Sequence, residues 1–186
     1  MVFKGYKCFN GDLTNRYGAQ FEVGKEYQKT NIKFGNDGHG YHMCKNLVDT
    51  FRFFDSEDCV VAEVTGWGKY EEYDDDYYGY DDMYAFEHMR IERVLSRDDI
   101  IEIMLNSYTH TVKRFIQTFK LTPEEVELFH NKFNSNKSDD LEVLRYLLYY
   151  CIGDKDVFNK NRSKEEMEEV YEAWTKSLSK EPEKTI

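Results

Sequence analysis

The stretch YAFEHMRIERVLSRDDIIEIML, residues 84–105, decides the fold because its hydrophobic period changes near its middle. In its first half apolar and polar residues alternate, as they do along a β-strand. After Ser96 the apolar residues Ile100, Ile103 and Met104 recur at the spacing of an α-helix, about 3.6 residues per turn. The sequence therefore predicts an α+β fold in which strands come first and helices follow.

Other segments before residue 84 also carry strand patterns, and one carries a helix pattern. The predicted strands cover residues 3–9, 21–27, 40–44 and 59–64, and Gly66 and Gly68 are expected to end the last of them. A short helix over 46–54 is expected to follow the strand 40–44. We expect these elements to form a mixed or antiparallel sheet with one short helix. On the strand 84–94, alternation assigns one face to Phe86, His88, Arg90 and Glu92 and the other to Met89, Ile91 and Val94.

The second half of the chain has helical periodicity throughout. The pattern continues from residue 97 towards Phe119, and three more helices are expected to begin near 122, 138 and 163. Thr122 and Ser163 stand at cap positions followed by acids, and Gly153 is expected to end the helix before it. We therefore predict an α+β domain over residues 1–95, a helical subdomain over 96–180 and a frayed tail over 181–186.

The composition indicates an acidic protein with an aromatic core. The chain has 186 residues, a formal net charge of −11, 15 Tyr and 13 Phe, and it is long enough to bury a sizeable core. No stretch approaches the roughly 20 apolar residues that span a bilayer, and the first residues lack the apolar run of a signal peptide. We expect a protein of the bacterial host cytoplasm, with no membrane partner.

The cysteines give no sign of a metal or redox motif. Cys8, Cys44, Cys59 and Cys151 are far apart and form no Cys-x-x-Cys pair, so reduced, buried thiols are expected. His42 and Cys44 would point to one face of a strand, but two ligands make an incomplete zinc site. We expect no metal site and no cofactor.

Acidic charge is concentrated in residues 69–82, KYEEYDDDYYGYDD, where seven acids stand against one lysine. This tract would repel nucleic acid, whereas a positively charged protein groove would attract it. Five tyrosines lie among the acids, and tyrosine supplies a large contact area at low entropic cost. The predicted partner-binding residues are Tyr70, Glu71, Glu72, Tyr73, Asp74, Asp75, Asp76, Tyr77, Tyr78, Asp81 and Asp82.

Two other interpretations of the acidic tract stay open. A run of like charges is most often a solvated loop. The aspartates would also suit Ca²⁺ if they converged, but they lack the spacing of an EF-hand.

Catalytic residues are harder to identify because no strong motif occurs. A cluster of His, Lys and Arg side chains would cleave RNA without a metal, by activating a 2′-hydroxyl and stabilising the phosphorane. Such a site would need His42 and His88 on neighbouring strands. The candidate catalytic residues are His42, His88, Lys7 and Arg90, with Arg16 as a further basic group.

Four motifs follow one another in the first half of the chain. They are Tyr6-Lys7-Cys8-Phe9, Phe21-Glu22-Val23-Gly24-Lys25, Gly40-Tyr41-His42-Met43-Cys44-Lys45-Asn46 and Arg90-Ile91-Glu92-Arg93-Val94-Leu95-Ser96. In this order they resemble the signatures of an uncharacterised domain family that occurs widely in bacteriophages and mobile elements, over residues 4–103. The resemblance implies no particular chemistry. The strand with Gly-x-His and its short helix are also similar to the ADP-ribosyltransferase fold, although no nicotinamide-binding Arg or catalytic Glu is found.

The departures from that family indicate where a special function would lie. Its members carry a short basic or neutral turn in place of the acidic tract, and many lack the helical half. The resemblance and the charge together favour an accessory protein of a phage or mobile element that inhibits a host nucleic-acid-targeting defence enzyme. An anti-CRISPR protein, which would dock on the basic channel of an RNA-guided nuclease, is the concrete example.

Two alternatives to this inhibitor remain. One is an enzyme, which would cleave guide RNA or act as an NAD-dependent transferase similar to the ADP-ribosyltransferases. The other is an immunity or structural protein with an unrelated partner.

Overall fold

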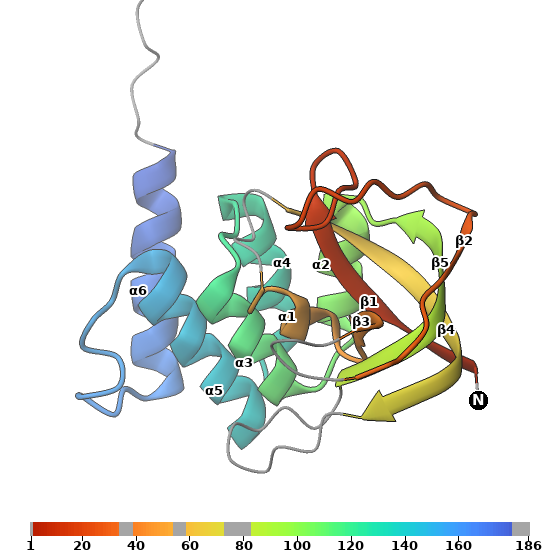
Figure 1. Cartoon of the computed structure of the whole chain (residues 1–186). Coiled ribbons are helices and arrows are strands. Elements are labelled where there is room, and N and C mark those ends of the chain that lie inside the picture. Colours follow the sequence, from red (N-terminus) through yellow and green to blue (C-terminus); the bar gives the residue numbers. More distant parts are fainter. Residues whose placement is uncertain (1, 34–38, 54–58, 73–82, 180–186) are drawn as a thin grey trace, which may run out of the picture. The chain divides into compact units, whose positions relative to one another are not determined.

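The computed structural model describes residues 2–33, 39–53, 59–72 and 83–179. Contacts divide the chain into two compact units, residues 1–100 and residues 101–186. Strands make up most of the first unit and helices the second, as the sequence colours of Figure 1 show. The predicted α+β class is therefore confirmed.

The first unit is built from antiparallel strands and one short helix. The strands are β1 (Val2–Asn10), β2 (Glu26–Gln28), β3 (Tyr41–Cys44), β4 (Cys59–Glu72) and β5 (Met83–Val94), and the helix is α1 (Leu47–Thr50). β1 pairs with both β3 and β4, and β5 pairs with the same two strands, so these four strands close into a ring. β2 pairs with β5 only. Of the two predicted arrangements, the antiparallel sheet is the observed one.

Aromatic side chains from several strands form the core of the first unit. The ring centroid of Phe21 lies 5.3 Å from that of Phe9 and 4.9 Å from that of Tyr27. The whole buried cluster comprises Phe3, Phe9, Phe21, Tyr41, Met43, Ala62, Val64, Tyr84, Phe86, Met89 and Ile91. Six of the eleven residues in this cluster are Phe or Tyr, so aromatic side chains make up much of this core.

β4 runs straight through the two glycines that were expected to end it. A side chain at Gly66 would come within 2.6 Å of the Phe86 ring, so glycine here allows close packing. Gly68 has a left-handed φ of 88° and lies where the register with β5 shifts, between Trp67 and Tyr70. The predicted strand end at residue 64 is wrong because these glycines mark a close contact and a bulge.

A second departure lies on β5, opposite the same bulge. Simple alternation assigned Phe86 to the face opposite Met89 and Ile91, but all three are buried in one core. Two residues of β4, Gly68 and Lys69, stand opposite Glu87 alone, and simple alternation does not hold on β5 between Phe86 and Met89.

Two predicted elements are shorter than expected. Of residues 21–27, only the end belongs to a strand, because Gly24 adopts a left-handed φ of 81° and interrupts the alternation. The helix predicted over 46–54 is limited to the single turn of α1, and residues 54–58 lie outside the described part of the chain.

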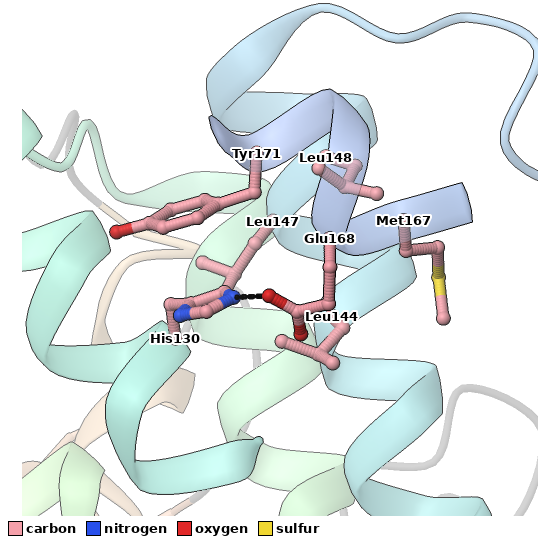
Figure 2. A pocket seen from close by; sticks show the side chains of 7 residues that line it. All are labelled: His130, Leu144, Leu147, Leu148, Met167, Glu168 and Tyr171. Atoms are coloured by element: carbon pink, nitrogen blue, oxygen red, sulfur yellow. Dashed lines mark hydrogen bonds and ion pairs between the residues drawn. The ribbon is translucent and has the colours of Figure 1, made fainter. Parts of the chain in front are cut away.

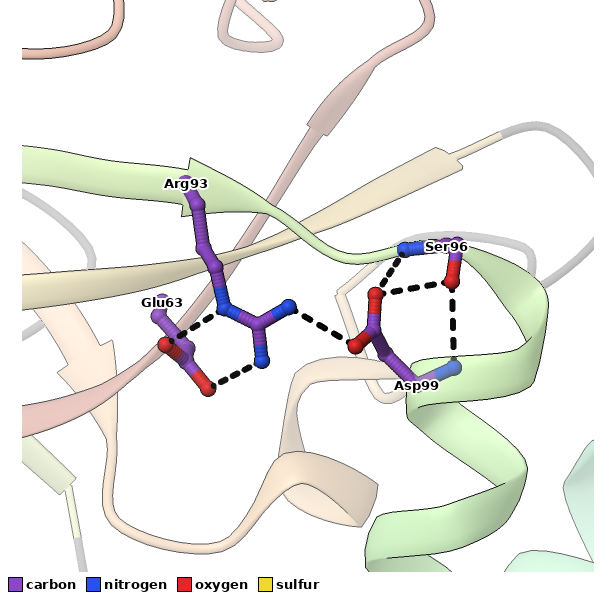
Figure 3. A network of polar contacts seen from close by, with 4 residues as sticks. All are labelled: Glu63, Arg93, Ser96 and Asp99. Atoms are coloured by element: carbon purple, nitrogen blue, oxygen red, sulfur yellow. Dashed lines mark hydrogen bonds and ion pairs between the residues drawn. The ribbon is translucent and has the colours of Figure 1, made fainter.

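An ion-pair network ties the start of α2 (Arg97–Leu105) to the sheet, as Figure 3 shows. Arg93 of β5 lies 2.9 Å from a carboxylate oxygen of Glu63 and 2.7 Å from one of Asp99. Asp99 also accepts hydrogen bonds from the backbone N–H and the hydroxyl of Ser96, as the predicted capping pattern requires. By its contacts, the first unit includes the start of α2 and ends after Ile100.

The second unit consists of helices that follow the predicted caps closely. Besides the end of α2, it contains α3 (Thr109–Thr118), α4 (Pro123–Phe133), α5 (Ser138–Tyr146), η1 (Leu147–Ile152) and α6 (Lys164–Leu178). Thr122 with Glu125 and Ser163 with Glu166 form full capping boxes. Gly153, with a φ of 89°, ends η1. In the part of the chain that the structure describes, no helix is long and apolar enough to cross a membrane.

Two helical predictions need correction. The helical pattern from 97 towards 119 corresponds to two helices, since the helix is interrupted between Leu105 and Thr109. The helix predicted from 138 to 152 changes at Leu147 into η1, which is a π-helix. The apolar residues of both stretches recur at helical spacing, so the sequence pattern reveals neither the break nor the π-helix.

Candidate functional site

The predicted docking surface begins on the last residues of β4. Tyr70 packs on Phe86 of β5, with ring centroids 5.5 Å apart, while 44% of its surface stays exposed. Further along, the Tyr84 hydroxyl donates a hydrogen bond to Glu72 Oε1 at 2.9 Å. Glu71 and Glu72 are both exposed. The first acids of the tract are therefore presented by two paired strands.

The other residues of that surface lie outside the described part of the chain. They are Tyr73, Asp74, Asp75, Asp76, Tyr77, Tyr78, Asp81 and Asp82. Their role in partner binding stays a prediction. The structure does fix both ends of this segment, because Glu72 on β4 pairs with Tyr84 on β5.

Lys7, a candidate catalytic residue, faces the core of the first unit. It lies opposite Ala62 of the buried cluster, and directly opposed residues share a face of the sheet. Its Nζ donates to the backbone carbonyl of His42 at 2.7 Å and lies 5.7 Å from the ring centre of Phe9. Burial lowers the pKa of Lys7 to about 8. Perturbation of this kind is common at functional sites.

His42 and His88 lie on neighbouring strands, as the predicted catalytic site requires, but the register separates them. His42 pairs with Ala85, and His88 is three residues further along β5, roughly 10 Å away along the strand. The His88 ring stacks on Trp67, with centroids 5.3 Å apart and 4° between the ring planes. The structure does not join the two imidazoles in one site.

Arg90 lies still further along β5 and is engaged with acids. Its guanidinium is 2.9 Å from Glu92 and 3.9 Å from Glu26. These ion pairs hold it on the surface, two residues beyond His88. Of the four candidate catalytic residues, only Lys7 and His42 are therefore brought together, through a backbone carbonyl.

A different set of cations acts electrostatically on His42. Lys29, directly after β2, places its Nζ 5.1 Å from the ring centre of Tyr41. Arg16 lies in the loop after β1. Burial is the main cause that lowers the pKa of His42 to about 4, and the charges of Lys7, Lys29 and Arg16 lower it further. We call Lys7, Arg16, Lys29 and His42 the basic cluster.

Lys29 was not predicted from the sequence, because its place in the cluster depends on strand pairing. The backbone N–H of Lys29 donates to the carbonyl of Glu87 at 2.8 Å, and Tyr41 pairs with Phe86. Consecutive positions along β5 thus bring the ends of β2 and β3 together. Without the register, no signal in the sequence links Lys29 to His42.

The second unit contains one buried histidine beside a small cavity, shown in Figure 2. His130 Nε2 lies 3.0 Å from Glu168 Oε2, and the ring stacks on Tyr171 with centroids 3.6 Å apart. The cavity, of about 10 Å³, is lined mainly by Leu144, Leu147, Leu148 and Met167. A space of this size holds about one water molecule, so it is no substrate site. The contact joins α4 to α6 and suits a structural role.

The cysteines form a compact thiol group in the first unit. The Sγ atoms of Cys8 and Cys59 are 3.3 Å apart, and Cys8 and Cys44 are both buried. The hydrogen bond with Cys59, followed by burial, raises the pKa of Cys8 far above its usual range, so this thiol stays protonated. Among the described residues, no group of three His, Cys, Asp or Glu side chains is placed to hold a metal ion.

Comparison with known proteins gives one match, to a family. The model described as "Domain of unknown function (DUF7666)" matches residues 3–103. No curated protein and no solved structure matches the chain. The matched region contains the five strands, the acidic tract and the basic cluster.

Proposed function

Because this chain belongs to the DUF7666 family, whose description assigns no activity, we propose from its own residues that it acts by docking on a basic partner protein. The concrete case is an anti-CRISPR protein, carried by a phage or mobile element, that inhibits an RNA-guided nuclease of the host. Such a nuclease holds its nucleic acid in a positively charged channel. An acidic protein that fits the channel competes with the nucleic acid for the same charges.

The observation that carries this proposal is the local density of acidic residues. Seven acids fall within residues 69–82, whereas an even distribution of the 36 acids over 186 residues would place about three there. Concentrated charge raises the rate at which an oppositely charged partner is found and favours one orientation over others.

The stem formed by β4 and β5 supports the same proposal. Tyr70 packs on Phe86, and Glu72 is fixed by the Tyr84 hydroxyl, so the first part of the tract is held before any partner arrives. A surface that is ordered in advance loses less conformational entropy on binding. The half-exposed ring of Tyr70 also offers apolar contact area beside the acids.

Binding to guide-loaded RNA-guided nucleases, measured at rising salt, tests the proposal. The wild-type chain should bind at least one nuclease of a panel, inhibit its DNA cleavage, and lose affinity as salt increases. The triple variant Asp74→Asn, Asp75→Asn, Asp76→Asn should bind at least tenfold more weakly.

A control variant separates local charge from total charge. Glu102→Gln, Glu127→Gln and Glu169→Gln remove three exposed acids outside the tract and give the same net charge. This control should bind like the wild type. Undiminished binding by the aspartate variant, or an equal loss in the control, would reject the docking role of the tract.

The basic cluster favours a second candidate function, an enzyme that acts on RNA or an NAD-dependent transferase. His42 has a pKa lowered to about 4, so at neutral pH its imidazole is uncharged, although it is then only a weak base. Cations beside it would stabilise a phosphorane or bind the pyrophosphate of NAD.

Product analysis distinguishes this candidate from docking. The chain is incubated with a guide-loaded nuclease, with and without NAD; guide length is read on a gel and added ADP-ribose by mass spectrometry. Product that disappears in His42→Gln, while nuclease binding remains, would identify an enzyme. Intact guide and unmodified protein would remove this candidate.

A further inference from the structure

The register of the first sheet places three cysteines on one of its faces. Residues directly opposed across two strands share a face, and so do alternate residues along one strand. Cys44 of β3 is opposite Tyr6, and Cys59 of β4 is opposite Asn10. Cys8 is two residues from each of these β1 positions. Cysteines that are far apart in the sequence are therefore brought to the same side of the sheet.

Two of these three thiols are close enough to react with each other. The Sγ atoms of Cys8 and Cys59 lie 3.3 Å apart, and both residues are present as thiols. A disulfide bond is about 2.05 Å long, so the two sulfurs need to approach by about 1.3 Å. Cys59 is the first residue of β4, so an adjustment there disturbs the pairing with β1 at one end only.

The two thiols differ in how easily an oxidant reaches them. Cys8 is 4% exposed and lies on β1, against which α1 packs. Cys59 is only half-buried. Oxidation favours the more accessible sulfur, and sensor cysteines often stand next to a second cysteine that resolves the first product. Cys59 is therefore the thiol to be oxidised first, and Cys8 is the resolving thiol.

We propose that Cys8 and Cys59 form an oxidant-sensitive site that reacts with hydrogen peroxide and closes reversibly to a disulfide. The Cys59 sulfur attacks a peroxide oxygen; an S–O bond forms, the O–O bond breaks, and the thiol proton leaves in the first water. The Cys8 sulfur then attacks the sulfenic sulfur of Cys59; the S–S bond forms, the S–O bond breaks, and the Cys8 proton passes to the departing oxygen to give a second water. The two thiols lose two electrons, which reduce the peroxide to water. Attack by an added thiol reverses the reaction.

The disulfide would join the end of β1 to the start of β4. The two cysteines are 51 positions apart, and the loop that they would close contains β2, β3 and α1. A cross-link between distant residues restricts the unfolded chain, and the stabilisation grows with the length of the loop. The oxidised first unit should therefore resist unfolding better than the reduced one.

Mass spectrometry of the full chain, treated with a small excess of hydrogen peroxide, tests the proposal. The treatment should remove two of the four thiols, lower the mass by two hydrogen atoms, and link the peptides that contain Cys8 and Cys59. Dithiothreitol should restore both thiols. A peptide map without this link, or with Cys8 joined mainly to Cys44, would overturn the proposal. The map of the wild type decides the question even where a variant folds poorly.

Single variants test the order of the two steps. Cys8→Ala lacks the resolving thiol, so dimedone, which reacts with sulfenic acids, should label Cys59 at least tenfold more than in the wild type. In Cys59→Ala, Cys8 should be oxidised at least tenfold more slowly. Cys44→Ala and Cys151→Ala are the controls, and both should form the link at a rate within twofold of the wild type. Equal labelling of Cys59 in the wild type and in Cys8→Ala would reject Cys8 as the resolving thiol.

Thermal melting measures the consequence for the fold. The oxidised chain should melt at a temperature at least about 5 °C above that of the reduced chain, and the same treatment should leave Cys59→Ala unchanged. Equal melting temperatures after complete formation of the link would contradict the stabilising effect. The site does not rest on the docking proposal. The triple aspartate variant of the tract should form the link as the wild type does, so each proposal fails separately.

Discussion

The first unit holds two groups of cations that differ in what surrounds them. Arg90 and Arg93, on the outside of β5, lie beside acids on the same strand, on neighbouring strands and on α2. Lys7, Arg16 and Lys29 all lower the pKa of His42 through their charges. A cation neutralised within the fold helps to hold the fold together. Cations that act on one another without an ion pair do not, so mutation should destabilise the protein in the first group and not in the second.

The largest effect is expected from Lys7→Met. The pKa of Lys7 falls from 10.5 to about 8 on folding, so between these values the unfolded chain binds more protons and stability rises with pH. Removing the charge should raise the free energy of unfolding at pH 7 by ~2–3 kcal/mol, and the gain should vanish above pH 10.5. Urea denaturation at several pH values measures both. A variant less stable than the wild type at pH 7 would show that the hydrogen bond to His42 outweighs the cost of burying the charge.

Acid should weaken the fold through His42. Its pKa falls from 6.5 to about 4 on folding, so stability is lost as the pH drops from 6.5 towards 4, where the unfolded chain takes up a proton and the folded chain does not. Between pH 7 and pH 4.5 the wild type should lose ~2 kcal/mol more than His42→Gln. The exposed His110, changed to Gln, is the control and should behave as the wild type does. Parallel losses in all three proteins would contradict the assignment.

Arg93→Gln should lower the free energy of unfolding, and by less than Lys7→Met raises it. Hydrogen bonds from Arg93 and Ser96 lower the pKa of Asp99 to about 2 in the folded protein. In the variant, this pKa should rise towards its ordinary value. Ionised Asp99 stabilises the folded protein, so as the pH falls this stabilisation should be lost at a higher pH than in the wild type. NMR titration of the Asp99 carboxyl carbon measures the shift. An unchanged pKa would mean that Ser96 alone sets it.

The smallest effect on stability is expected from the exposed cations of the basic cluster. Arg16→Gln with Lys29→Gln removes two surface charges that make no ion pair within the described chain, so the unfolding free energy should change by less than ~0.5 kcal/mol. Thermal melting checks this value. A large destabilisation would place these two residues with the structural cations and remove the contrast between the groups.

Periodicity and caps predicted the elements well, because both are local. Thr122 and Ser163 began helices and Gly153 ended one, since each acts through residues a few positions away. Gly66 and Gly68 led to a wrong strand end because their roles depend on another strand. Gly66 packs against the Phe86 ring of β5, and Gly68 lies at a shift in the pairing with β5. A glycine needed for close packing looks the same in sequence as one that ends a strand.

The candidate site was less predictable than the fold. Lys7 and His42 were selected for their chemistry, and the structure does bring them together, although through a backbone carbonyl. His88 and Arg90 were selected in the same way, but their distance from His42 depends on the pairing of β3 with β5. Lys29 had no signal of its own, because only the positions of β2 and β3 along β5 place it beside Tyr41.

The closed ring of β1, β4, β5 and β3 also bears on how the protein behaves at high concentration. Within the described chain, each of these strands has a neighbour on both sides, and only β2, three residues long, has a single partner. Open strand edges are where folded chains add to one another and begin to aggregate. A phenol-rich protein whose longer described strands all pair on both sides should add to itself less readily than an open sheet would, even in salt that screens its acidic surface.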